Sequence, residues 1–185
     1  REMEGSRGLG DVYKRQFDNW YFKSFSNQSP LQATIYNIMK KEKILITGGS
    51  GFVGTNLIDK LPKDFYEIFS LDIEKPKTNF DVVNYENLDI RSKHIGELIK
   101  DIDPKIILHL AAQSSVSVSS KNPVLDNDVN LSGSLNLFLN STKSNVEQFI
   151  SFSTGGAIYG EELVKNFIES DNTRPLSPYG ISKLN

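Results

Sequence analysis

From Lys43 onward, short apolar runs alternate with longer segments whose apolar residues recur every three or four positions. The apolar runs predict buried β-strands at 43–47, 67–73, 82–88, 105–112 and 147–154. The spaced pattern predicts helices at 52–61 and 94–102, a long helix after Pro123, and a helix beginning near Pro178. Near-continuously apolar strands that alternate with helices indicate a parallel sheet covered on both faces. The sequence therefore predicts an α/β fold with a doubly wound parallel sheet.

The segments before Met39 lack this pattern. Residues 1–16 have no apolar periodicity, and their DVYKRQ peptide resembles a translated sequencing-library adapter, so we expect a non-native segment. Residues 17–38 are aromatic and polar without a clear period, which suits either read-through of upstream sequence or a disordered or surface-packed extension. Met39 opens MKKEKILITGG, which resembles a natural start, so the predicted domain is 39–185.

Composition excludes several classes of function. A net charge of −2 and a sequence pI of about 5.8, without a basic stripe, disfavour nucleic acid as a partner. The chain has no cysteine, which rules out disulfides and thiolate metal sites, and we expect no metal. No apolar run approaches the length of a membrane span, so we expect no membrane partner and a cytoplasmic location.

Glycines recur at Gly48, Gly51 and Gly54, directly after the first predicted strand and at the start of a helix. In a dinucleotide-binding turn the first glycine permits the bend, the second lets the backbone approach a pyrophosphate, and the third lets helix and strand pack closely. Backbone N–H groups and the positive end of the helix then face the phosphates. An ordinary glycine-rich turn is the alternative, which the strand–turn–helix context disfavours.

Asp72 ends the second predicted strand, 24 residues after Gly48. A carboxylate at this position can accept hydrogen bonds from an adenosine ribose and would repel a 2′-phosphate. It therefore favours NAD over NADP, although Lys75 and Lys77 lie nearby in the sequence. The alternative is a solvated acid in a loop.

Six motifs follow one another along the chain: TGGSGFVG, LDI, LDIR, HLAAQSSV, STGGAIYG and SPYGISK. In this order they resemble the extended short-chain dehydrogenase/reductase family, in particular its NAD-dependent nucleotide-sugar epimerases and dehydratases. The resemblance covers about 43–185, and the UDP-glucose 4-epimerases are the most similar members. It implies a Rossmann-like fold, NAD as cofactor, a UDP-sugar as substrate and a homodimer of the full-length protein.

The resemblance also implies cofactor contacts outside the glycine turn. Phe52 and Val53 would lie over the pyrophosphate, and Asp89 and Ile90 would flank the adenine. The segment after the fourth strand would line the cofactor further on, with Leu110, Ala111, Ala112 and Gln113. Asn130 matches a family asparagine that either helps to organise the site or only braces its helix. His109 is expected to pack in the core.

Tyr179 and Lys183 form a Tyr-x-x-x-Lys pair near the end of the chain. A tyrosine phenol with a pKa of about 10 is a poor base at neutral pH. Lys183 follows Tyr179 by one helical turn on the same face, so its ammonium can stabilise the phenolate. The resemblance implies that Tyr179 carries the proton and that Lys183 also hydrogen-bonds the nicotinamide ribose.

A third catalytic hydroxyl is expected in the STGGAIYG loop. Relatives place a Ser or Thr four residues before the tyrosine of the YG pair, and Gly155 occupies that position here. We assign the role to Thr154, because a one-residue shift of the loop would present its hydroxyl. Ser153 is the alternative, and Thr154 would then only close the preceding strand.

The same loop distinguishes the possible reactions. Related 4,6-dehydratases carry an Asp-Glu acid/base pair directly after the Thr, whereas this chain has Gly155 and Gly156, so dehydration lacks its machinery. Epimerisation at C4 needs Tyr179, a hydroxyl and NAD: deprotonation accompanies hydride transfer to NAD, the 4-keto sugar turns over, and hydride returns. We therefore predict an NAD-dependent nucleotide-sugar epimerase acting on UDP-glucose and UDP-galactose. Because HLAAQSSV is also similar to nucleotide-4-keto-sugar reductases, these remain the alternative.

Family members continue past the Tyr-x-x-x-Lys helix with further strands and a region that grips the sugar nucleotide. We therefore expect the chain to be the N-terminal part of a longer enzyme. The 185-residue piece itself is expected to be inactive, as an NAD-binding remnant.

Overall fold

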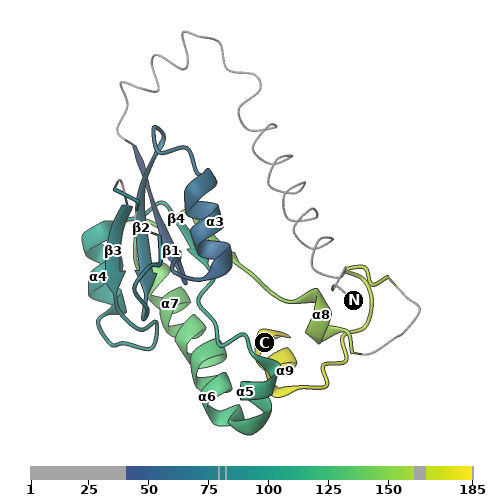
Figure 1. Cartoon of the computed structure of the whole chain (residues 1–185). Helices are drawn as coiled ribbons and strands as arrows, with labels where there is room; N and C mark the ends of the chain where they lie inside the picture. The colour runs from purple at the N-terminus through teal and green to yellow at the C-terminus, as the bar shows by residue number, and fades with distance from the viewer. Residues whose placement is uncertain (1–40, 79, 82, 161–165, 185) are drawn as a thin grey trace. The chain divides into compact units, whose positions relative to one another are not determined.

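The computed structural model describes residues 41–78, 80–81, 83–160 and 166–184 of the 185-residue chain (Figure 1). The segments 1–16 and 17–38, whose origin the sequence left open, lie outside the described residues. The described part of the predicted domain begins at Lys41.

Five strands pair in parallel to form one sheet: β1 (Glu42–Thr47), β2 (Tyr66–Asp72), β3 (Val83–Asn87), β4 (Ile106–His109) and β5 (Gln148–Ser151). Their order is β3-β2-β1-β4-β5. The direction of winding reverses between β1 and β4, which is where doubly wound sheets bind ligands beyond the carboxyl ends of their strands. The predicted doubly wound, Rossmann-like α/β fold is confirmed.

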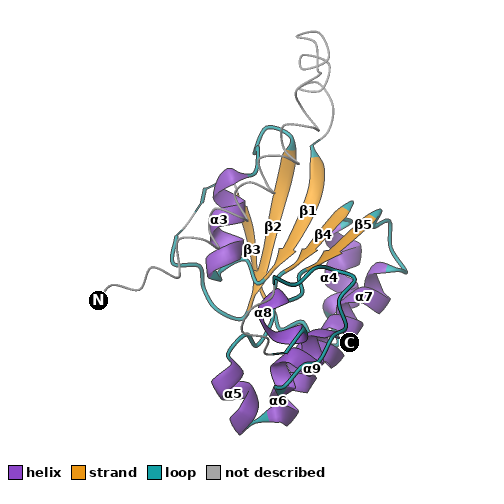
Figure 2. Cartoon of the chain, turned by 90° about the vertical axis from the view of Figure 1, so that its right-hand side faces the viewer, coloured by secondary structure: helices purple, strands orange, loops and turns teal. Residues whose placement is uncertain are grey.

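The helices between the strands have the following bounds: α3 (Phe52–Lys60), α4 (Ile95–Ile102), α5 (Val116–Lys121), α6 (Pro123–Asn127), the π-helical segment η2 (Asp128–Gly133), α7 (Ser134–Ser141), α8 (Gly155–Ile158) and α9 (Pro178–Leu184). Helix α3 lies on one face of the sheet, and α4 and α7 lie on the other (Figure 2). Helices α5, α6, α8 and α9 gather beyond the arrowheads that mark the carboxyl ends of the strands (Figure 2).

The hydrophobic core lies between the central strands and the helices on the α4 side. Leu45, Leu71 and Ile107 from three neighbouring strands pack with apolar residues of α4 and α7, including Ile99 and Leu137. Each of these side chains is fully buried. The apolar stripe of α4, predicted from its spacing, is therefore the face that the helix buries against the sheet.

Several predicted elements are shorter or less regular than the sequence pattern indicated. Strand β4 ends at His109 and β5 ends at Ser151, so residues 110–112 and 152–154 are loops at the carboxyl edge of the sheet. The predicted long helix does begin at Pro123, but the π-helical segment η2 interrupts it. Helices α5 and α8 were not predicted. All of these differences lie where the motifs of the candidate site gather.

Candidate active site

The glycine turn between β1 and α3 has the geometry of a phosphate-binding turn. Gly48 has a φ of +72°, a left-handed conformation that favours glycine. A Cβ at Gly48 would lie 2.6 Å from the Ala111 nitrogen, and a Cβ at Gly54 would overlap the Gly48 carbonyl oxygen. Gly51 is exposed on the turn. The first and third glycines thus serve the bend and the close packing of α3, as the sequence predicted.

Asp72 lies beside this turn at the end of β2. Its Oδ2 accepts a hydrogen bond from the Ser50 N–H at 3.0 Å, and its Oδ1 accepts one from the Glu74 N–H at 3.0 Å. A carboxylate offers about four acceptor positions, so both oxygens can still accept a ribose hydroxyl. Phe52 and Val53, in the first turn of α3, are 85% and 48% exposed and so remain open to a ligand on the turn.

The two residues predicted to flank the adenine have different surroundings. The Arg91 guanidinium donates to both oxygens of Asp89 and holds the pKa of that carboxyl below its ordinary value. Arg91 also bonds Asp128 at 2.7 Å, which ties the loop after β3 to η2. Ile90 is buried, and its side chain lies where a Cβ on Gly133 would have to go. Because its side chain is buried, Ile90 could contact a cofactor only through its main chain.

The segment after β4 lies against the glycine turn. The N–H of Leu110 donates to the Thr47 carbonyl at 3.0 Å, and the N–H of Ala111 donates to the Thr47 hydroxyl at 3.2 Å. Leu110, Ala111, Ala112 and Gln113 are all half-buried at this edge of the sheet. His109 is 1% exposed, which confirms its expected place in the core.

Helix α9 carries Tyr179 and Lys183 one turn apart. Ser177 caps its start, because its hydroxyl accepts the Gly180 N–H at 3.0 Å, and Pro178 takes the first helical position. The Tyr179 N–H donates to the buried hydroxyl of Ser119 at 2.6 Å. Ser119 belongs to α5, so this unpredicted helix fixes the start of the helix that carries the tyrosine.

Lys183 is half-buried close to the carboxyl end of β4. Burial lowers the pKa of its ammonium, and the negative charge of Asp126 opposes that shift. Burial also lowers the pKa of His109 to about 4, with a smaller contribution from the charge of Lys183. The adjacent Ser182 is tied to the segment after β4, because Asn130 donates both to the Ser182 hydroxyl and to the Gln113 carbonyl. The glycine turn and the Tyr-x-x-x-Lys helix meet at the end of the same strand.

The two candidates for the third hydroxyl are distinguished by their hydrogen bonds. The Ser153 hydroxyl donates to the Lys183 carbonyl at 3.1 Å, which holds the end of α9. The half-buried Thr154 begins α8, and its side chain makes no capping hydrogen bond to that helix. Cβ atoms added at Gly155 and Gly156 would meet nothing within 4 Å. Thr154 thus has the hydroxyl available for a ligand.

A buried polar network behind the site was not found from the sequence. Asn130 is 4% exposed; its amide accepts the Gln113 N–H at 2.8 Å and donates to the Gln113 carbonyl at 2.9 Å. These contacts suit the bracing role that the sequence left open for Asn130. Asp126 and Ser182 complete the network. The sequence could have indicated Asp126, because it lies one helical turn before Asn130.

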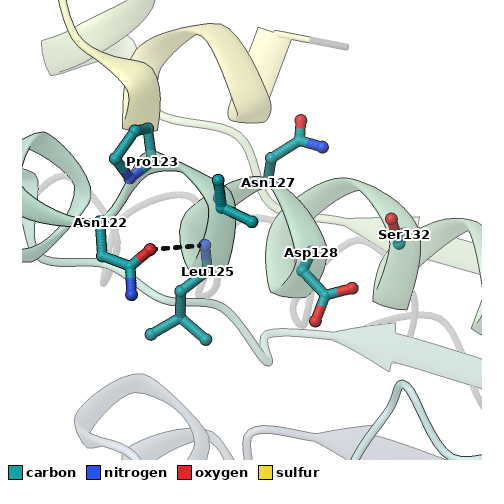
Figure 3. Close-up of a pocket in the computed structure, with 7 residues that line it drawn as sticks. Asn122, Pro123, Leu125, Asn127, Asp128 and Ser132 are labelled. Atoms are coloured by element: carbon teal, nitrogen blue, oxygen red, sulfur yellow. Dashed lines mark hydrogen bonds between the residues drawn. The ribbon is translucent and has the colours of Figure 1, made fainter.

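A groove of about 640 Å³ on the outer side of α6 and η2 contains none of the predicted site residues (Figure 3). Two of its polar side chains already have structural partners. The Asn122 side chain accepts the Leu125 N–H at 3.1 Å and caps α6, while Asp128 pairs with Arg91. We therefore place the candidate site at the carboxyl edge of the sheet and not in this groove.

Two absences hold for the residues that the structure describes. No helix among them is long and apolar enough to cross a membrane. They also contain no group of three or more His, Cys, Asp or Glu side chains arranged to hold a metal ion.

The fold and the turn geometry define a dinucleotide-binding α/β protein. The family model of the NAD-dependent epimerase/dehydratase family matches residues 44–185. The chain belongs to this family, whose cofactor is NAD, and the resemblance seen in its six motifs is confirmed.

Solved structures of UDP-glucose 4-epimerases are similar to this chain. The Thermus thermophilus enzyme, solved in complex with NAD, is 38% identical with a TM-score of 0.72, over 76% of this chain and 47% of that one. The Thermotoga maritima enzyme, solved with UDP-glucose, is 38% identical with a TM-score of 0.71, over 77% and 48%. A dehydratase is also similar: human dTDP-D-glucose 4,6-dehydratase is 32% identical over 77% of this chain and 44% of the relative. The chain spans about half the length of the curated relatives it matches.

Proposed function

We propose that this chain is the NAD-binding and proton-transferring part of a nucleotide-sugar 4-epimerase acting on UDP-glucose and UDP-galactose. The observation that carries the proposal is the meeting of two parts of the fold at the end of β4. Ala111 lies against Gly48 of the glycine turn, and Asn130, which donates to the Gln113 carbonyl two residues later, also donates to the Ser182 hydroxyl of α9. A dinucleotide on the turn and the Tyr179 helix would therefore share one site.

The residues present fit NAD. The turn bends at Gly48 and packs closely at Gly54, and the exposed Gly51 has no Cβ to keep a pyrophosphate away from the backbone. Asp72 lies beside the turn with acceptor capacity left for a ribose. Lys183 would hold the nicotinamide ribose. When bound, NAD would accept hydride reversibly, while side chains of this chain accept and return the proton.

Tyr179, Lys183 and Thr154 have distinct roles in this proposal. Tyr179 removes the proton from the C4 hydroxyl of the sugar and later returns it. The ammonium of Lys183 stabilises the phenolate of Tyr179, an effect that strengthens in a half-buried site where water screens less. The free hydroxyl of Thr154 would orient the C4 oxygen. The substrate class comes from the relatives named above and not from a contact in this chain.

Dehydration is less well supported, despite the similarity to a human dehydratase. The positions after Thr154 are Gly155 and Gly156, which carry neither an acid nor a base for the elimination of water. A Cβ at either position would meet nothing within 4 Å, so an acidic side chain would fit there. The sequence nevertheless has glycine at both positions. A 4-keto-sugar reductase remains the second candidate, because it needs the same tyrosine and lysine.

The proposal is tested with a hybrid in which residues 41–184 replace the matching half of the Thermus thermophilus enzyme. The expected result is NAD-dependent interconversion of UDP-galactose and UDP-glucose, abolished by Tyr179→Phe. The NAD content of the purified hybrid separates misfolding from a wrong function. A hybrid that retains NAD and reduces a 4-keto sugar, but does not interconvert the two sugars, would favour the reductase.

A further inference from the structure

Asp126 is a carboxylate with only 1% of its surface exposed. Its Oδ2 accepts a hydrogen bond from the Ser182 hydroxyl at 2.5 Å. Its Oδ1 accepts hydrogen bonds from Gln113 Nε2 at 2.8 Å and from Asn130 Nδ2 at 3.3 Å. A carboxylate tolerates burial when such hydrogen bonds replace its water. Asp126 therefore joins α6 to the loop after β4, to η2 and to α9.

Ser182 is the residue directly before Lys183 and is itself buried. Its hydroxyl also lies 3.1 Å from the Tyr179 carbonyl, three residues earlier on the same helix. Helix α9 (Pro178–Leu184) is held by tertiary contacts on its buried side, where Gly180 and Ser182 lie. Its rotation about its own axis is therefore decided by the groups that hold its buried side. The bond from Ser182 to Asp126 and the bond from Tyr179 N–H to Ser119 are two such contacts.

We propose that Asp126 is a positioning residue, which through Ser182 sets the orientation of α9 and thereby directs Tyr179 and Lys183 toward the cofactor. The inference rests on the proposed function, because that function gives Tyr179 and Lys183 their roles. Asp126 does not touch the reacting atoms in this arrangement. It acts through the helix, and its charge also favours the ammonium form of Lys183.

The effect on the pKa of Lys183 should be specific to the charge of Asp126. His109, which faces Lys183 from β4, is neutral near pH 7 because burial holds its pKa at about 4. Asp126, which faces Lys183 from α6, is the negative group that raises the pKa of Lys183 against the effect of burial. Removal of the Asp126 charge should therefore lower the pKa of Lys183, whereas removal of a remote charge should not.

The test compares Asp126→Asn with Asp128→Asn in the 185-residue chain. Asp128 is a matched control, because it follows two residues later, is exposed, and pairs with Arg91 away from α9. Calorimetry gives the dissociation constant of NAD, and NMR titration of labelled lysine gives the pKa of Lys183. We expect Asp126→Asn to weaken NAD binding by about tenfold, the effect of losing a buried charged hydrogen bond, and to lower the pKa of Lys183. Asp128→Asn should leave the pKa of Lys183 unchanged.

Ser182→Ala provides a second variant, which keeps the Asp126 charge and removes its bond to α9. It should weaken NAD binding while lowering the pKa of Lys183 less than Asp126→Asn does. If Asp126→Asn does not fold, as judged by thermal unfolding, Ser182→Ala alone decides. Unchanged NAD affinity in Ser182→Ala, or an equal effect of Asp126→Asn and Asp128→Asn on the pKa of Lys183, would overturn the inference. Absence of NAD binding by the unsubstituted chain would instead contradict the proposed function.

Discussion

The hydroxyl oxygen of Thr47 lies 2.7 Å from Nδ1 of His109 and joins the ends of β1 and β4 inside the core. On the other side of the ring, Ser134 donates its hydroxyl proton to the Asn130 carbonyl, so its oxygen accepts the Nε2–H of His109 at 2.7 Å. Burial lowers the pKa of His109 to about 4, so the imidazole is neutral near pH 7; its proton then lies on Nε2 and Thr47 donates to Nδ1. Hydrogen bonds therefore lead from β1 through His109 and Ser134 to Asn130 of η2. Asn130 in turn bonds Ser182 of α9.

Acid should destabilise the chain through His109. Burial, with a smaller effect of Lys183, holds its pKa at about 4, whereas a histidine in the unfolded chain titrates at about 6.5. Between these values the unfolded chain binds the extra proton, so stability is lost as the pH falls. The loss from this group reaches about 3 kcal/mol at the lower value.

The measurement is urea unfolding of two variants over this pH range. His109→Gln should show a shallower decline in stability than His94→Gln, since His94 is exposed and lies outside the core. Carboxylates contribute equally to both variants. Identical declines would contradict the proposed neutral, buried state of His109.

Gly48→Ala should destabilise the fold and abolish NAD binding. An alanine there would adopt a left-handed φ and place its Cβ against the Leu110–Ala111 backbone, at a cost of about 2 kcal/mol or more. Gly155→Ala is the matched control, because a Cβ at that position meets nothing within 4 Å. Thermal unfolding of the two variants should differ clearly. A Gly48→Ala chain as stable as Gly155→Ala would show that the turn has a different geometry.

Thr154 and Ser153 should respond differently to removal of their hydroxyls. In the hybrid enzyme, Thr154→Val should lower turnover by roughly 100-fold, as for loss of one catalytic hydrogen-bond donor. Ser153→Ala should chiefly lower stability, by about 1 kcal/mol, since its hydroxyl bonds the end of α9. The reverse pattern would assign the catalytic role to Ser153.

Gly155→Ser offers a rescue of Thr154→Val. The position has open space and is the one where relatives carry a hydroxyl, so a serine there should restore part of the lost turnover. Gly156→Ser, one residue further on and equally open, is the control. If Thr154→Val combined with Gly155→Ser were only as active as Thr154→Val combined with Gly156→Ser, the third hydroxyl would not need a specific position.

Asp72→Asn should reduce the preference for NAD over NADP. The amide keeps the size of the side chain but removes the charge that would repel a 2′-phosphate, so the ratio of the two dissociation constants should change by about tenfold or more. Titration of both cofactors against the chain measures this. Glu74→Gln, which removes an exposed charge two residues later, should leave the ratio unchanged.

Much of the fold could be predicted because its signals are local. Runs such as KILIT are too short for a helix and apolar on both faces, so they predicted central strands, and the observed β1 at Glu42–Thr47 agrees. Gly48 and Gly54 were placed correctly because a strand–turn–helix connection demands glycine where the chain bends and where the helix packs. Pro178 likewise marked the start of α9. Each of these residues is constrained by its immediate neighbours in sequence.

Helix α5 shows where such reasoning fails. Its sequence VSVSSK alternates apolar and polar residues with a period of two, which is a strand pattern. It is nevertheless helical: Ser115 caps it by accepting the Val118 N–H at 3.3 Å, and Ser119 is buried against the start of α9. Tertiary contacts thus override local propensity, as they do in the π-helical segment of the following helix.

The sequence by itself determined the order of the elements, the glycine turn and the spacing of Tyr179 and Lys183, since each depends on residues within one or two turns of chain. Only the tertiary structure decided what surrounds them: the burial of Asp126 and His109, and the bond from Asp126 to Ser182 56 residues later. Burial and pairing depend on segments brought together by the packing of the whole sheet. A local sequence pattern does not show which polar side chains will be buried away from water. The roles proposed for Asp126 and His109 depend on that burial.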